Sequence, residues 1–321
     1  FSEFTSHLLR ITLRLEVPLR DFSPRDNFAG IFLSVAMRSK LPPSHSATTQ
    51  FSGELEMYKA VISDLDGTLL NSQHQVSDLT RTTLKTLIDG GVKFIVATGR
   101  HIIDVQGIRQ TMGFECELIT SNGALVSAAD DSLLFQYTLA PEMAADLIRL
   151  SDGNADYDTN IYTRNDWFLA REAPELLEFH KDSGFVYTVA DLSQIDMTGI
   201  HKFCFTGEHE TLLGLEHILL ERYPSQASIV FSRDDCLEVM APNVNKGNSA
   251  KEALAAFGLD IDDAIAFGDG MNDYEMLSMA ARGFVMNNAT ERLKRALPAH
   301  PVAAHCDDDG VARQLIEIFG L

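Results

Sequence analysis

From Met57 onward, short apolar segments that end in polar residues alternate with amphipathic segments of helical period. The spacing predicts strands at 60–64, 92–100 and 117–123 and helices at 77–90 and 102–112. Consecutive strands joined by helices form a parallel sheet with right-handed crossovers, and the helices then cover both faces. The start of this region therefore predicts an α/β fold with a doubly wound, Rossmann-like sheet.

The same alternation returns after Pro242, but the intervening region has a different pattern. There the sequence predicts hairpins at 160–170 and 228–242, a strand at 200–207 and helices between them, which is an α+β pattern. We therefore expect a core domain made of 57–140 and 242–321, interrupted by an inserted domain at 141–241. The length of 321 residues agrees with two domains, at about 150 residues each.

Residues 1–56 lack a sustained hydrophobic period and end in the linker-like stretch LPPSHSATTQFSGE. We expect the folded protein to begin at Met57. On this interpretation, residues 1–56 are an N-terminal extension that is disordered or not native.

The charge balance excludes some classes of partner. The chain has 26 basic and 46 acidic residues, a net charge of −20, which disfavours nucleic acids and anionic membrane surfaces. Its four cysteines form no CxxC pair and suit free thiols in a reducing cytoplasm. We expect a cytoplasmic protein without nucleic-acid or membrane partners, either a monomer or a small homo-oligomer.

Four polar segments stand where ligands bind in open α/β sheets, at the carboxyl ends of strands or at a helix start. They are DLDGT (Asp64–Thr68), TGR (Thr98–Arg100), Lys246 and GDGMND (Gly268–Asp273). Each alone is weak, because turns, calcium loops and solvated lysines use the same residues. Their occurrence together, in this order, indicates a site that handles phosphate.

The residue types support that interpretation chemically. Asp64, Asp66, Asp269 and Asp273 form a carboxylate cluster, and a hard cation with oxygen ligands such as Mg²⁺ would neutralise it. Lys246 at a helix start and the Thr98 hydroxyl suit an anion. A carboxylate beside such a site can act as a nucleophile and form an aspartyl-phosphate.

These segments resemble the four motifs of the haloacid dehalogenase (HAD) superfamily, with DLDGTLL, ATGR, Lys246 and GDGMND in family order. Segment 141–241 resembles the C2-type cap of its Cof-like subfamily IIB, and Ser121–Ala124 also fits. The resemblance covers 57–321. It is greatest to enterobacterial phosphatases of pyridoxal 5′-phosphate and sugar phosphates. It implies a Mg²⁺-dependent phosphomonoester hydrolase for small phosphorylated metabolites.

The resemblance also implies roles for single residues. Asp64 would be the nucleophile and Asp66 the general acid/base, with the Asp66 backbone carbonyl as a metal ligand. Asp64 and Asp269 would be carboxylate ligands of Mg²⁺, with Asp273 beside or behind them. The groups expected to hold the phosphoryl oxygens are Thr98, Lys246, Asn272 and the backbone of Leu65 and Gly99.

Several alternatives stay open at this level. A sugar phosphomutase or phosphotransferase would use the same nucleophile, and a non-catalytic regulator that binds phosphometabolites is a third class. In the cap, Arg164 and Trp167 are candidates for substrate contact, although Trp167 also suits the cap core. His101 faces the cleft or simply begins a helix.

Overall fold

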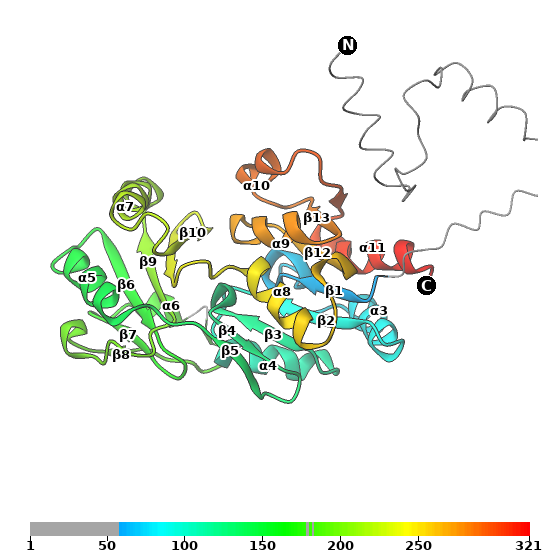
Figure 1. The fold of residues 1–321 in the computed structure, drawn as a ribbon, viewed down its shortest axis with the longest axis horizontal. Coiled ribbons are helices and arrows are strands. Elements are labelled where there is room, and N and C mark those ends of the chain that lie inside the picture. Colours follow the sequence, from blue (N-terminus) through cyan, green and yellow to red (C-terminus); the bar gives the residue numbers. More distant parts are fainter. Residues whose placement is uncertain (1–57, 178–179, 182) are drawn as a thin grey trace, which may run out of the picture. The chain divides into compact units, whose positions relative to one another are not determined.

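The structure is a computed structural model that describes residues 58–177, 180–181 and 183–321, all within one compact unit, Glu56–Leu321. The chain forms an eight-stranded sheet in the order β14-β13-β12-β1-β2-β3-β4-β5 and a six-stranded sheet in the order β10-β11-β9-β6-β7-β8 (Figure 1). The predicted α/β fold class is confirmed. The predicted extension at 1–56 lies outside the described residues.

The first sheet contains β1 (Ala60–Ser63), β2 (Lys93–Ala97), β3 (Glu117–Thr120), β4 (Leu125–Ser127), β5 (Leu133–Gln136), β12 (Ala264–Gly268), β13 (Arg282–Met286) and β14 (Val302–Ala303). The second contains β6 (Tyr157–Tyr162), β7 (Trp167–Leu169), β8 (Thr188–Val189), β9 (Lys202–Gly207), β10 (Ser228–Arg233) and β11 (Cys236–Met240). The helices are α3 (Asp78–Asp89), α4 (Ile102–Met112), α5 (Pro141–Ser151), α6 (Pro174–Leu177), α7 (His209–Arg222), α8 (Lys246–Ala256), α9 (Tyr274–Met279), α10 (Glu291–Ala296) and α11 (Gly310–Phe319).

Six strands of the first sheet, from β14 to β3, are parallel, and the hairpin of β4 and β5 extends it in antiparallel pairing. Every residue of β1 and β12 is buried, as expected for central strands covered by helices on both faces. The chain moves across the sheet in one direction from β1 through α3 to β2 and through α4 to β3, and in the opposite direction from β12 through α9 to β13. By the rule of right-handed crossovers, α9 therefore covers the face opposite to α3 and α4. Helix α8 packs against α9, and α11 packs against α3.

The second sheet has one face packed against helices and one face that does not join that core. Side chains alternate along β9, so Phe203 and Phe205 enter the apolar core with Leu237 and Val239 of β11. Lys202 and Cys204 of β9 therefore lie on the opposite face. All strands of this sheet lie within the predicted insertion at 141–241.

The structure differs from the prediction at a few boundaries. The strand expected at 117–123 ends at Thr120, because Ser121 and Asn122 adopt positive φ angles of 49° and 54°. The strands β8 and β14 were not predicted, because each has only two residues and so shows no alternation of apolar and polar side chains. In the described part of the chain, no helix is both long and apolar enough to cross a membrane.

The loop that follows β1, Leu65–Leu69, turns through Gly67, whose φ is +71°. A Cβ atom at this position would lie 2.5 Å from Asp269 Oδ2, which is closer than van der Waals contact allows. Only glycine therefore lets the chain turn away from β1 while Asp269 keeps its place.

We predict that Gly67→Ala destabilises the protein by about 2–4 kcal/mol, from left-handed backbone strain and the clash with Asp269. Gly153→Ala is the matched control, because Gly153 has the same φ of +71° and a Cβ there meets nothing within 4 Å. It carries the backbone strain alone, about 1–2 kcal/mol. Urea unfolding measures both, and equal losses would contradict the proposed clash.

Candidate active site

The four predicted segments meet at the centre of the first sheet. Strands β12, β1 and β2 are neighbours, so their carboxyl ends place GDGMND, DLDGT and TGR side by side. Helix α8 begins with Lys246, after Asn245 caps its first turn by accepting a hydrogen bond from the Asn248 N–H at 2.8 Å. Residues separated by about 200 positions in the sequence thus share one site.

Lys246 lies at the base of this site and is completely buried. Its Nζ donates hydrogen bonds to Asp64 Oδ1 at 2.7 Å and to Asp273 Oδ1 at 2.6 Å. Burial by itself lowers the pKa of Lys246, but the carboxylates of Asp273 and Asp64 outweigh it and raise that pKa above its ordinary value. The ammonium group therefore stays charged and ties β1 to the loop after β12.

Asp273 shapes the loop in which it lies. Its Oδ2 accepts hydrogen bonds from the backbone N–H groups of Asp269 and Gly270, both at 2.9 Å. Both carboxylate oxygens are therefore engaged, one by the loop and one by Lys246. Thr68 adds a further restraint, since its hydroxyl donates to Asp269 Oδ1 at 2.9 Å.

The donor set fits a hard divalent cation. One carboxylate oxygen from each of Asp64, Asp269 and Asp273 lies within 4.8 Å of the others. Burial, followed by the charge of Asp273, raises the pKa of Asp64 well above its ordinary value and that of Asp269 to about 7. Lys246 neutralises only part of this charge, and oxygen-only ligands are those that Mg²⁺ prefers.

The side chain of Asp66 has different partners from that of Asp64. Arg100 binds it with two hydrogen bonds, from Nε to Oδ2 at 2.7 Å and from a terminal nitrogen to Oδ1 at 2.5 Å. His74 Nδ1 lies 3.6 Å from the same Oδ1. The contact between Arg100 and Asp66 is bidentate, which is the strongest arrangement of arginine and a carboxylate.

The residues predicted to bind phosphate differ in their hydrogen bonds and in whether they line the cavity. Thr98 Oγ1 accepts a hydrogen bond from the Arg100 N–H at 3.1 Å, which orients the hydroxyl. Asn272 Nδ2 donates to Asn122 Oδ1 at 2.9 Å. Thr98, Gly99 and Asn272 line the cavity described below, whereas Lys246 and Leu65 have no exposed surface and do not line it.

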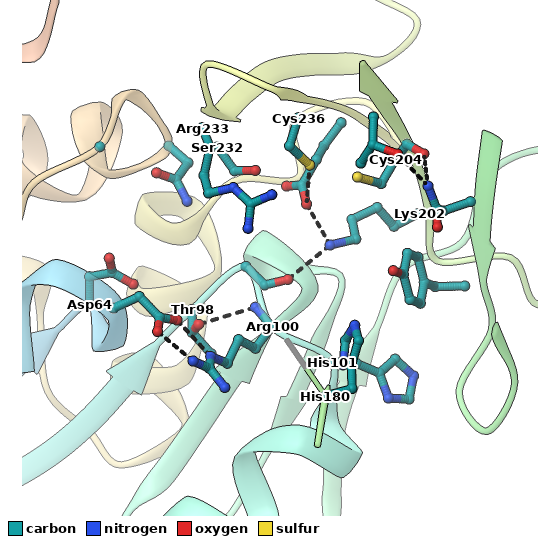
Figure 2. Close-up of a pocket in the computed structure, with 18 of the residues that line it drawn as sticks. Asp64, Thr98, Arg100, His101, His180, Lys202, Cys204, Ser232, Arg233 and Cys236 are labelled. Atoms are coloured by element: carbon teal, nitrogen blue, oxygen red, sulfur yellow. Dashed lines mark hydrogen bonds and ion pairs between the residues drawn. The ribbon is translucent and has the colours of Figure 1, made fainter. Parts of the chain in front are cut away.

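A cavity of about 490 Å³ opens between these loops and the second sheet. Figure 2 shows Asp64, Thr98 and Arg100 along one side and Lys202, Cys204 and Cys236 along another. Its lining consists of Asp64, Asp66, Gly67, His74, Thr98, Gly99, Arg100, His101, Asn160, Tyr162, Trp167, Leu176, His180, Lys202, Cys204, Thr206, Ser232, Arg233, Cys236, Glu238, Asp269, Gly270 and Asn272. The size suits a small metabolite.

A family model of haloacid dehalogenase-like hydrolases matches residues 61–315, which is most of the chain. The chain belongs to the haloacid dehalogenase-like hydrolase family. The predicted family and enzyme class are confirmed, since relatives of this hydrolase bear the name phosphatase.

Three of these similar proteins illustrate the relationship. A putative phosphatase of Haemophilus influenzae is 41% identical over 266 residues, covering 82% of this chain and 98% of the relative. An HMP-PP phosphatase of Yersinia pseudotuberculosis is 37% identical over 259 residues, covering 81% and 94%. A solved sugar phosphatase of HAD subclass IIB shares the fold, with a TM-score of 0.71, 22% identity and coverage of 82% of this chain and 99% of its own.

Sequence reasoning missed a buried charged pair on the second sheet of the hydrolase. Lys202 Nζ donates to Glu238 Oε1 at 2.6 Å and to the Gly99 carbonyl at 2.9 Å, and Asn122 Nδ2 donates to Glu238 Oε2. Burial lowers the pKa of Lys202, but Glu238 reverses this and raises it. One feature of the sequence could have indicated this pair: each of the apolar strands KFCFT and CLEVM contains one charged residue.

Trp167 and Arg164, the two candidates for substrate contact in segment 141–241, lie in different surroundings. Trp167 lines the cavity but is only 1% exposed, because Tyr162 stacks on it at 5.6 Å between ring centroids and its Nε1 donates to Asn160 Oδ1. These contacts favour the core interpretation. Arg164 is exposed in the turn before β7 and is not among the residues that line the cavity.

His101 both begins α4 and lines the cavity, so its two interpretations are compatible. Its Nδ1 accepts from the Ile103 N–H, and its Nε2 lies 2.8 Å from the Thr163 carbonyl oxygen. Burial lowers the pKa of His101 to about 4. The neutral ring stacks on Phe185 at 4.4 Å between centroids.

The raised pKa of Asp269 predicts a pH-dependent stability of the metal-free hydrolase. A carboxyl whose folded pKa rises from 3.8 to about 7 favours folding below the unfolded pKa, and this contribution is lost as pH rises through about 7. We expect Tm without metal to fall between about pH 4 and pH 7, the two pKa values of Asp269 in the unfolded and folded chain. Added Mg²⁺ should raise Tm more at the higher pH. Scanning calorimetry of Asp269→Asn, which cannot ionise, should show a smaller fall, and an equal fall would contradict the assignment.

The pair on the second sheet predicts a large effect of Lys202→Met. Removing one partner of a buried ion pair leaves the other charge without compensation, so we expect a loss of about 3–5 kcal/mol of unfolding free energy. Lys59→Met is the control, because Lys59 pairs with Asp263 at 2.8 Å on the surface, with 60% of its side chain exposed. Urea unfolding that gave equal losses for both variants would contradict a buried pair.

Proposed function

We propose that the chain is a Mg²⁺-dependent phosphomonoester hydrolase that acts on small phosphorylated metabolites through an aspartyl-phosphate on Asp64. The supporting observation is the position of Asp64, which lines the cavity while Lys246 holds its Oδ1 at 2.7 Å. A carboxylate restrained in this way keeps one orientation toward a bound ester.

Asp64, Asp269 and the Asp66 backbone carbonyl would hold the metal ion, which would neutralise phosphoryl charge. Asp273 has both oxygens engaged by Lys246 and its own loop, so we assign it to positioning Asp269. In this role Asp273 acts through its hydrogen bonds to the loop that carries Asp269.

In the first step, an oxygen of Asp64 attacks phosphorus, and the bond from phosphorus to the ester oxygen breaks. The leaving oxygen takes a proton from Asp66 and departs as an alcohol. Asp66 then removes a proton from water, which attacks phosphorus and releases inorganic phosphate and the Asp64 carboxylate. Thr98, Gly99 and Asn272, which line the cavity, would bind the phosphoryl oxygens in both steps.

The pair between Arg100 and Asp66 adds a condition to this mechanism. Both Asp66 oxygens accept hydrogen bonds from the guanidinium, so proton transfer requires at least one of these bonds to exchange. Arg100 also lines the cavity, where an anionic substrate would compete with Asp66 for its N–H groups. We infer that substrate binding releases Asp66 for its role.

We further propose that 141–241 is a cap domain that selects the substrate. Its strands supply Asn160, Lys202, Cys204 and Glu238 to the cavity wall. Pyridoxal 5′-phosphate and sugar phosphates are our candidates, and the compound named HMP-PP joins them because a relative is named for it. The buried, free state of all four cysteines supports a reducing compartment such as the cytoplasm.

We predict that Asp64→Asn abolishes turnover, because an amide cannot act as the nucleophile. The loss should reach at least about 10⁴-fold, as for other residues that form the covalent intermediate. Phosphate release from a panel of phosphate esters, with Mg²⁺ present and absent, measures it. Asp130→Asn, a change in an exposed turn, is the control and should keep activity.

The same panel tests the substrate classes. Release of phosphate only with Mg²⁺ is the expected result for at least one ester of the panel. Activity of Asp64→Asn equal to that of the unaltered chain would refute the nucleophile, and transfer of phosphate to a sugar hydroxyl instead of water would favour a phosphotransferase.

A further inference from the structure

The second sheet presents two thiols and a carboxylate to the cavity. Strands β9 and β11 pair antiparallel, with Cys204 opposite Glu238 and Cys236 opposite Thr206. Because side chains alternate, these residues share the face opposite to the apolar core of that sheet. Figure 2 shows Cys204 and Cys236 beside Lys202 at the cavity wall.

The three ligand atoms lie close enough for a single ion. The sulfurs of Cys204 and Cys236 and a carboxylate oxygen of Glu238 all lie within 4.8 Å of one another, and the three residues are buried. Zinc binds thiolate sulfur at about 2.3 Å and carboxylate oxygen at about 2.0–2.2 Å, so ligands of one tetrahedral ion lie about 3.8 Å apart. The upper limit of 4.8 Å exceeds that spacing by about 1 Å.

The pairing of the strands favours a metal over a disulfide. Cys204 and Cys236 are diagonal neighbours, whose Cα atoms in such sheets lie about 7–8 Å apart. A disulfide needs Cα atoms closer than about 7 Å, whereas a metal between the sulfurs spans the longer distance.

The local charge is also suitable. Two thiolates and Glu238 would carry three negative charges, which a divalent ion and the Lys202 ammonium at 2.6 Å from Glu238 would balance. The Cys236 thiol donates to Glu238 Oε1 at 3.9 Å, so loss of its proton to solvent frees that oxygen for the metal. The hydrogen bond with the neighbouring Cys236, followed by burial, raises the pKa of Cys204, so the thiol is neutral until a metal displaces its proton. Soft thiolate ligands select thiophilic ions over Mg²⁺.

We propose that Cys204, Cys236 and Glu238 form a second metal site, selective for a thiophilic divalent ion such as Zn²⁺ or Cd²⁺. Binding forms two metal–sulfur bonds and releases the two thiol protons to solvent. Because these residues line the cavity that holds Asp64, an ion there occupies space next to the substrate and inhibits hydrolysis. This inhibitory consequence rests on the proposed function, but the metal site does not.

The test is a titration of the full chain with Cd²⁺ in excess Mg²⁺, followed by the ultraviolet charge-transfer absorption of Cd²⁺–thiolate bonds. We expect the absorption to saturate at one Cd²⁺ per chain. Cys204→Ser and Cys236→Ser should each weaken binding by more than the roughly 10–100-fold that loss of a residue supporting a ligand costs. Glu238→Gln should weaken binding and keep the absorption, since both sulfurs remain.

Two controls separate this site from others. Cys306→Ser should keep the absorption, although Cys306 lies beside His305 and Asp307 in another cluster of metal-ligating side chains. Asp64→Asn should keep it as well, so failure of the phosphatase mechanism leaves this test intact. Cadmium should also inhibit phosphate release by the unaltered chain, and less so by Cys204→Ser.

Three outcomes would overturn the site. They are no charge-transfer absorption in the unaltered chain, undiminished absorption in Cys204→Ser and Cys236→Ser, and loss of absorption in Cys306→Ser. Circular dichroism of each variant verifies its fold, and the titration of the unaltered chain decides the matter if a variant does not fold.

Discussion

The active site depends on one buried ammonium group. Lys246 has no exposed surface, and burying an unpaired charge costs several kcal/mol, so its partners must stay in place. Asp64 and Asp273 meet that requirement from two different strand ends. The same contacts hold β1, the loop after β12 and the start of α8 in one arrangement.

This constraint extends outward through hydrogen bonds. Asp273 accepts from the backbone of Asp269 and Gly270, so the loop that supplies Asp269 follows the position of Lys246. Burial, followed by the charge of Asp273, raises the pKa values of Asp64 and Asp269. Alignment of these dipoles before the substrate arrives is what the proposed binding of a cation and a phosphoryl group requires.

A second buried ion pair, between Lys202 and Glu238, connects the inserted segment to the loops of the first sheet. Lys202 donates to the Gly99 carbonyl, and Glu238 accepts from Asn122. The residues that line the substrate cavity on the two sheets are thus joined through groups that cannot be moved without exposing a buried charge. Cys204 and Cys236 lie beside this pair and form, with Glu238, the metal site that we propose.

Much of the fold and of the active site was predictable from local patterns. The strands β1, β2 and β12 are short, apolar and followed by polar residues, and parallel strands must bring those ends together. Lys246 and Asp64 were therefore identifiable before their contact was known. The positive φ of Asn122 and the pairing of Arg100 with Asp66 were not, because both depend on neighbours distant in the sequence.

The sequence by itself determined the α/β class and the residues of the four motifs, since periodicity and strand-end chemistry are local properties. The insertion at 141–241 stays a prediction. The tertiary structure alone decided that Asp66 lies against Arg100, that Trp167 is buried beside Tyr162 on the cavity-facing side of the second sheet and that two cysteines face the cavity. The register of strand pairing and the packing of distant segments decide where a side chain points and which residues it contacts. The local spacing of residues does not encode either of them.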